Sequence, residues 1–306
     1  MSMKAKAFVC LHGFGNHSGG HRPGFSAALR RAVEARLGAK TVWKEVLWDG
    51  LLGSPDSFGT MDLALQTPAL VRDFYEGRAG DAVRARVAEA VRAASAEAGG
   101  APVVLVGHSF GAAIAYETLA RALAPEAKSL VMLAPPMGLF NRPERLAAHA
   151  IFGMPERREA AAARGRLGPG AVERIFNAFA APIQAVAGLP EVKGDRLPDD
   201  VSALSLRSPE DWFAEPRGEA FPDVSEREVL PPPGTRGGAN HKFYWADPVV
   251  AESVAAAAVA ACSHAGEPPA TAAEFELLSR AAEDSLWSAG EYELDENGDV
   301  VGGSIS

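Results

Sequence analysis

Cysteine is scarce in this chain, which has only Cys10 and Cys262, far apart in the sequence. Two such distant cysteines provide no disulfide framework, so a small disulfide-stabilised domain is excluded and we interpret both as buried free thiols. A long uninterrupted apolar run is also lacking. The most apolar long stretch, residues 249–262, contains Glu252 and Ser253 and falls short of the roughly 18 residues of a membrane helix. We therefore expect no transmembrane segment.

Positive charge is in deficit as well. Lys and Arg total 30 and Asp and Glu total 39, which gives a formal net charge of -9. An acidic chain repels polyanions, so nucleic acid is not expected as a partner. The apolar run that starts at residue 7 leaves no room for a signal peptide after Met1, and we expect a cytoplasmic protein. With 306 residues, 47% of them hydrophobic, the chain has enough apolar surface for a substantial core.

The most informative stretch is the pentapeptide Gly-His-Ser-Phe-Gly at residues 107–111. A short β-branched run precedes it and residues with helical spacing follow it, as in a nucleophile elbow, where a strained strand-to-helix turn exposes the hydroxyl of Ser109. Gly107 and Gly111 fit this interpretation because strand and helix approach too closely there for a side chain. The helix start beneath the serine would offer N–H groups and a positive dipole end to an oxyanion.

Strand and helix patterns alternate along the chain. Short apolar runs followed by loops predict strands, and apolar residues at helical spacing predict helices. Their alternation predicts an α/β fold, a mostly parallel sheet of about six strands with helices on both faces. The expected strands are residues 7–11, 41–48, 102–106, 129–133, 201–206 and 226–230, and the expected helices are residues 25–37 and 81–98, one after Ser109, and one begun by Asp247 as N-cap and Pro248.

Residues 137–200 interrupt this alternation. Arg, Ala, Gly and Pro are frequent there, and no strand–helix–strand unit is evident. We expect a helical lid or cap inserted into one core domain, which residues 1–136 and 201–290 would form together. In the tail, residues 291–306, an Asn-Gly pair between short runs is typical of a hairpin turn.

A serine nucleophile requires a base, and the chain has seven histidines. His241 is the predicted base, because it follows the last expected strand in a Gly-rich loop, where the chain returns to the carboxyl edge of the sheet. His108 adjoins Ser109 and is expected to point elsewhere. His12 is expected to shape the loop after the first strand. Two further histidines lie outside that loop, His149 in the expected lid and His264 at the end of the last expected helix.

The acid that orients such a base is expected on the loop after the strand that precedes the base's own strand. Asp211 meets this condition, and Glu210 is a possible substitute. A different division of the chain, with a strand at residues 182–187, would favour Glu191 or Asp195 instead. Asp211 is the predicted acid.

The loop after the first strand, residues 12–20, contains four glycines. In an elbow, one oxyanion N–H comes from the residue after the nucleophile, here Phe110, and the other comes from this loop, here Phe14. His17 in this loop and His21 directly after it have no supporting carboxylate, so no metal site is predicted.

Together these features resemble the α/β-hydrolase superfamily. The resemblance rests on the glycine-rich loop, the pentapeptide at residues 107–111 and the order Ser109, Asp211, His241, and it spans residues 7–262. The chain is similar to compact members such as small bacterial lipases and esterases. This resemblance implies a Ser-His-Asp triad, a small-molecule ester or acyl substrate, hydrolysis through an acyl-enzyme, and no metal or organic cofactor.

Two other functions stay open. The pentapeptide and the helix after it also resemble editing thioesterases of fatty-acid and polyketide assembly, which implies an acyl-carrier or acyl-coenzyme A substrate. A non-catalytic binding module on the same fold is the other alternative, although a binder has no need of Ser109 or His241. No pattern in the sequence predicts an oligomeric state or an acyl length.

Overall fold

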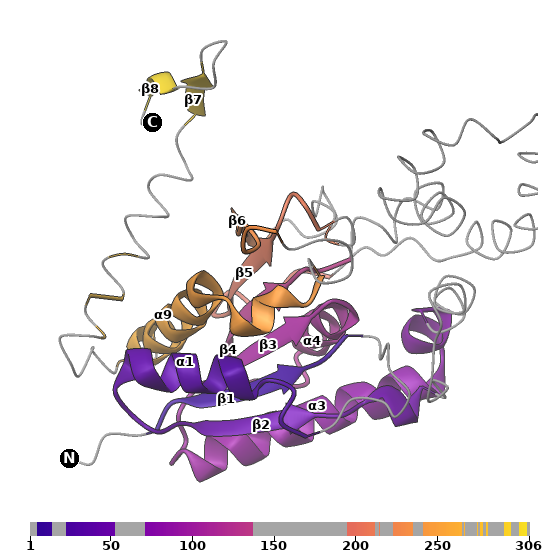
Figure 1. The fold of residues 1–306 in the computed structure, drawn as a ribbon. Coiled ribbons are helices and arrows are strands. Elements are labelled where there is room, and N and C mark those ends of the chain that lie inside the picture. Colours follow the sequence, from indigo (N-terminus) through magenta and orange to yellow (C-terminus); the bar gives the residue numbers. More distant parts are fainter. Residues whose placement is uncertain are drawn as a thin grey trace, which may run out of the picture.

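Six strands form one sheet at the centre of the protein (Figure 1). In this computed structural model the strands lie in the order β2-β1-β3-β4-β5-β6, and every neighbouring pair is parallel. The strands are β1 (Ala7–Leu11), β2 (Val42–Val46), β3 (Val103–His108), β4 (Ala127–Leu133), β5 (Ser202–Arg207) and β6 (Ser225–Glu228). The structure describes residues 5–13, 23–52, 71–136, 195–211, 214, 223–234, 241–264, 266, 274, 276, 277, 280, 291–294 and 300–304.

Helices cover both faces of the sheet. Helices α3 and α4 pack against β1 to β4 on one face, and α1 and α9 pack against each other and against the opposite face (Figure 1). The helices are α1 (Ala27–Leu37), α3 (Arg78–Glu97), α4 (Phe110–Ala120) and α9 (Pro248–His264), with short 3₁₀ helices η1 (Asp49–Leu51) and η4 (Phe243–Ala246).

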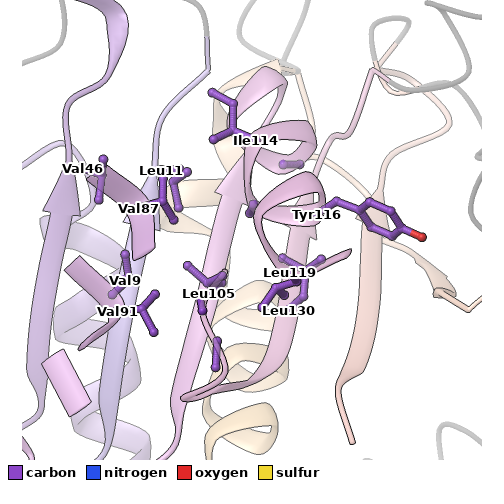
Figure 2. Close-up of a cluster of buried hydrophobic side chains, with 14 of the residues drawn as sticks. Val9, Leu11, Val46, Val87, Val91, Leu105, Ile114, Tyr116, Leu119 and Leu130 are labelled. Carbon is purple, nitrogen blue, oxygen red and sulfur yellow. The ribbon is translucent and has the colours of Figure 1, made fainter. Parts of the chain in front are cut away.

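The core consists of two apolar layers, one on each side of the sheet. Residues alternate between them along each strand, so that in β1 Val9 and Leu11 face α3 while Phe8 and Cys10 face α1 and α9. Figure 2 shows the first layer, in which Val87 of α3 lies among the side chains of β1. Because both layers are buried, the strands read in the sequence as continuous apolar runs.

Helix α9 begins as the sequence predicts. The Asp247 carboxylate accepts hydrogen bonds from the N–H groups of Val249 at 2.8 Å and Val250 at 3.1 Å, which is the arrangement of an N-cap. Buried alanines along α9, including Ala251 and Ala255, then allow a close approach to α1. Helix α9, which directly follows η4, is thereby fixed against α1.

The strand order reverses direction between β1 and β3. The chain passes from β1 outward to β2 and then returns to the other side of β1 with β3, so the two strands are neighbours. Leu11 pairs with Gly107, which brings the carboxyl ends of both strands to the same edge. Open α/β sheets bind ligands in the crevice at such a reversal. His12 and Gly13, which follow β1, and Ser109, which follows β3, lie at this edge.

The predicted fold class is therefore confirmed, with six parallel strands and helices on both faces. In the tail, β7 (Glu291–Leu294) pairs antiparallel with β8 (Val300–Ser304). The expected lid falls mainly at residues 137–194, which lie outside the described residues, so the division into core and lid stays a prediction. In the part of the chain that the structure describes, no helix combines the length and apolar character needed to cross a membrane.

Candidate active site

Ser109 occupies the turn between β3 and α4 in a strained conformation. Its φ is 53° and its ψ is -127°, values that L side chains rarely adopt and that cost about 1–3 kcal/mol. The surrounding backbone holds the turn in place, because the Ser109 N–H donates to the carbonyl of Leu133 at 2.8 Å and the Ser109 carbonyl accepts from Ala112 at 2.9 Å. The elbow is therefore anchored to β4 on one side and to α4 on the other.

Glycine is required on both sides of this serine, as the sequence predicts. A Cβ atom at Gly107 would lie 2.5 Å from the Cα of Ala112, and one at Gly111 would lie 2.3 Å from the carbonyl oxygen of His12. Gly13, in the loop after β1, also approaches too closely for a side chain, since its Cβ would lie 2.7 Å from the Cβ of Ser109. The loop after β1 thus packs directly against the elbow.

His12 shapes that loop and is fully buried. Its Nδ1–H donates to the carbonyl of Gly13 at 2.6 Å, and its Nε2 accepts from the N–H of Trp48 at 3.4 Å. The indole N–H of Trp48 donates to the His12 carbonyl at 2.9 Å, and the two rings are stacked with centroids 5.0 Å apart. Because both ring nitrogens are engaged in these contacts, His12 acts as a structural residue of the loop.

His241 and Asp211 lie in contact. The Nδ1 of His241 is 2.9 Å from Oδ2 of Asp211 and 3.2 Å from Oδ1. Asp211 is 2% exposed and ends a turn after β5, in which its N–H donates to the carbonyl of Ser208 at 3.1 Å. A carboxylate only accepts hydrogen bonds, so Nδ1 carries the proton in the neutral ring and Nε2 presents a lone pair. This tautomer suits a general base.

The other candidate acids occupy different places. Glu210 is exposed on the same turn, and its N–H donates to the Ser208 hydroxyl at 3.2 Å. The backbone carbonyl of Asp195 accepts a hydrogen bond from the Tyr116 hydroxyl at 2.9 Å. Glu191 lies outside the described residues. Among the candidate acids that the structure describes, the Asp211 carboxylate lies against His241.

His108 corrects an expectation, because its ring lies against His241 and does not point away from the site. Its Nε2–H donates to the backbone carbonyl of His241 at 2.6 Å, and the two ring centroids are 4.8 Å apart. The ring also packs near Trp245, at 5.6 Å. The last residue of β3 therefore holds the backbone of His241. Nothing in the sequence beyond its position at the carboxyl end of a central strand indicated this.

Tyr244 is a second residue that the sequence reasoning missed. Its buried hydroxyl lies 3.1 Å from Oδ2 of Asp211 and accepts the N–H of Ser208 at 2.8 Å. Burial and then the charge of Asp211 raise the pKa of this hydroxyl far above its usual range, so it stays protonated. Nothing in the sequence beyond its place three residues after His241 indicated this contact.

A family model described as the alpha/beta hydrolase family matches residues 8–287. The chain belongs to the alpha/beta hydrolase family. No curated protein matches its sequence.

Solved structures with a similar fold include other hydrolases. The pyrethroid hydrolase PytH is 17% identical, with a TM-score of 0.44, over 83% of this chain and 98% of that chain. The thioesterase RedJ from the prodiginine pathway of Streptomyces coelicolor is 17% identical, with a TM-score of 0.33, over 83% and 90% of the two chains. A proline iminopeptidase of Mycobacterium smegmatis is 19% identical, with a TM-score of 0.36, over 83% and 90%.

In this alpha/beta hydrolase, Phe110 is the first residue of α4, where backbone N–H groups point out of the helix end. Its buried ring is packed against Trp48 and Phe74, with centroid distances of 5.6 Å and 5.3 Å, which fixes the start of the helix. Phe14, the other predicted oxyanion donor, lies outside the described residues, as do His17 and His21. Among the residues that are described, no group of three or more His, Cys, Asp or Glu is placed to hold a metal ion.

Proposed function

We propose that this alpha/beta hydrolase is a serine hydrolase that cleaves carboxylic esters through an acyl-enzyme on Ser109, with His241 as base and Asp211 as acid. The observation that carries the proposal is the contact between His241 Nδ1 and the buried Asp211 carboxylate. It selects the tautomer whose Nε2 can accept the proton of a serine hydroxyl. The strained backbone of Ser109 supports the nucleophile role, because strain of this kind clusters at functional sites.

In the first half of the proposed reaction, Ser109 Oγ attacks the ester carbonyl carbon while its proton passes to Nε2 of His241. The negative charge moves to the former carbonyl oxygen, which the N–H groups of Phe110 and Phe14 would stabilise. The imidazolium is stabilised by Asp211, which keeps its negative charge. The imidazolium then returns the proton to the leaving alkoxide as the C–O bond breaks. An alcohol leaves and the acyl group stays on the serine.

In the second half, a water molecule takes the position of the alcohol. His241 accepts one of its protons as the water oxygen attacks the acyl carbon, and the same two N–H groups would stabilise the second oxyanion. When the bond to Ser109 Oγ breaks, His241 gives the proton back to the serine. The products are a carboxylic acid and the free enzyme, so the cycle needs no further reactant.

Labelling of the folded protein with a fluorophosphonate probe tests this proposal. Stoichiometric modification that peptide mass spectrometry maps to Ser109, together with hydrolysis of p-nitrophenyl butyrate, is the expected result. The Ser109→Ala variant is the control and should lose both. A folded wild-type protein that neither reacts with the probe nor hydrolyses the ester would overturn the proposal and favour a binding module.

The thioester alternative requires a separate comparison. The same acyl-enzyme forms from an ester or a thioester, so labelling at Ser109 does not distinguish them. The ratio of kcat/KM for p-nitrophenyl butyrate to that for butyryl-coenzyme A does. We expect the ester to be the better substrate, and a clear preference for the coenzyme A thioester would replace the ester assignment while keeping the roles of Ser109 and His241.

A further inference from the structure

One oxygen of the buried Asp211 carboxylate has two hydrogen-bonding neighbours. Oδ2 lies 2.9 Å from Nδ1 of His241 and 3.1 Å from the hydroxyl of Tyr244. Both residues belong to the same short segment between β6 and α9, and Tyr244 lies in η4. The side chain of Asp211 is 1% exposed, so water competes little for either contact.

The hydroxyl of Tyr244 has a defined direction. It accepts the N–H of Ser208 at 2.8 Å, and an N–H has no other role than donor. The single hydroxyl hydrogen is therefore left for the carboxylate, which only accepts. Ser208 also accepts the Asp211 N–H through its carbonyl, at 3.1 Å. Tyr244 thus closes a ring of contacts around the turn that presents Asp211.

We infer that Tyr244 is a positioning residue for the catalytic site, in that its hydroxyl orients the Asp211 carboxylate and limits how strongly it attracts the proton of His241. This inference rests on the proposed function, in which His241 alternates between its neutral and charged forms. A hydrogen bond donated to a carboxylate stabilises its negative charge. The oxygen that Tyr244 occupies then binds the Nδ1–H of His241 less strongly. Asp211 therefore still stabilises the His241 imidazolium during catalysis. The imidazolium releases its proton more readily than it would if Tyr244 did not donate to Asp211.

Other ionisable groups lie near Tyr244, Asp211 and His241 and contribute to the electrostatic potential at these residues. His108 faces His241 from β3, with 4.8 Å between ring centroids. The positive charge of Arg207, at the end of β5, acts to lower the pKa of Tyr244. Arg207 is itself ion-paired with Glu226 at 2.6 Å and with Glu228, both on β6. Glu210 is exposed on the turn beside Asp211. Substitution of Tyr244 by phenylalanine changes none of these charges, so a change in pH dependence would report the lost hydroxyl.

The Tyr244→Phe variant should shift the acidic limb of the kcat/KM profile to higher pH, because His241 then keeps its proton more strongly. We expect kcat to fall about tenfold with little change in KM, since a buried hydrogen bond to a charged group is lost. Tyr116→Phe is the matched control. It removes another tyrosine hydroxyl, which donates to the Asp195 carbonyl at 2.9 Å, and should leave the acidic limb in place.

Incorporation of 3-fluorotyrosine at position 244 provides a second variant that keeps the hydroxyl and its size. Fluorine next to the hydroxyl makes it a stronger donor, so the acidic limb should move to lower pH, opposite to Tyr244→Phe. The inference would be overturned if Tyr244→Phe lost activity only in proportion to its folded fraction and the acidic limb moved in neither variant. Tyr244 would then be merely structural.

A measurement that does not need turnover separates this inference from the proposed function. Nitrogen-15 NMR of histidine-labelled protein follows the protonation of the His241 ring directly, with a His241→Gln variant to assign its signals. A higher titration midpoint in Tyr244→Phe supports the inference even if the wild-type protein fails to hydrolyse esters. An unchanged midpoint in an active enzyme overturns the inference and leaves the serine hydrolase proposal standing.

Discussion

A Cβ atom at Gly111 would lie 2.3 Å from the carbonyl oxygen of His12, so the first turn of α4 and the loop after β1 are in backbone contact. The two segments are about a hundred residues apart in the sequence, and the register of β1 with β3 brings them together. The His12 carbonyl also accepts the indole N–H of Trp48 at 2.9 Å and is therefore held in place. The elbow has no room to relax at this point.

The Gly111→Ala variant should consequently be destabilised by about 3 kcal/mol or more, because the clash is with backbone and no side chain can rotate away. Gly50→Ala is the control, since a Cβ at Gly50 would meet no heavy atom within 4 Å. Its effect should stay within about 0.5 kcal/mol. Urea unfolding of both variants and the wild type measures the difference. Equal stability of the two variants would contradict the close approach.

The Asp211→Asn variant should reduce kcat by about 10³–10⁴-fold, because an amide group can donate to Nδ1 of His241 and favour the tautomer that has no lone pair at Nε2. Glu210→Gln makes the same chemical change one residue earlier, on an exposed side chain, and should leave kcat nearly unchanged. Steady-state kinetics with p-nitrophenyl butyrate compares them. A larger loss in the Glu210 variant would transfer the role of acid to that residue.

The sheet could be predicted from the sequence because its local and tertiary signals agree. Strands buried on both faces give apolar runs such as residues 7–11, and β1 has these limits. Helix α3 shows where local pattern was insufficient. Its apolar spacing predicted a start at residue 81, but the helix begins at Arg78 and includes Gly80, at which a Cβ would lie 1.8 Å from the Phe74 carbonyl oxygen. A close approach to the backbone six residues earlier in the chain, not helix propensity, decides the residue used there.

The candidate site could be predicted only in part, for a related reason. The order of strands and loops was enough to bring Asp211 near His241, because both follow strands toward the same edge of the sheet. Their catalytic roles, and that of Ser109, stay predictions. The contacts of His108 and Tyr244 depend on where side chains from different segments point once they are packed, and strand and loop order does not determine this.

The His108→Ala variant should lower kcat about tenfold to a hundredfold with a smaller effect on KM, because the His241 backbone loses the donor that lies 2.6 Å from its carbonyl oxygen. His108→Gln retains an N–H donor and should recover part of kcat. Steady-state kinetics and urea unfolding on both variants separate lost positioning from lost stability. If both variants lose the same activity at the same folded fraction, the hydrogen bond has no part in positioning His241.

Two glutamates, the buried Glu117 and the half-buried Glu34, should affect the pH dependence of stability in opposite directions. Burial raises the pKa of Glu117 in α4, and the Arg121 guanidinium, 3.2 Å away, opposes this only in part. The folded protein therefore keeps this proton to a higher pH than the unfolded chain does. The stability that Glu117 contributes is greatest below its unfolded pKa of about 4.3 and declines as pH rises toward the folded value. Glu117→Gln removes this decline, so the variant should gain stability relative to wild type between pH 4 and pH 7.

At Glu34 in α1 the sign reverses. Burial is the largest influence and acts to raise its pKa, but hydrogen bonds from the Thr41 N–H and hydroxyl and from Arg30 together lower it below its usual value. Its contribution is present above about pH 4.3 and is lost as pH falls through the folded pKa. Glu34→Gln should therefore cost more stability at pH 7 than at pH 3. Urea unfolding of both variants across this range is the measurement, and slopes of the same sign would show that one of the two carboxyl environments is assigned wrongly.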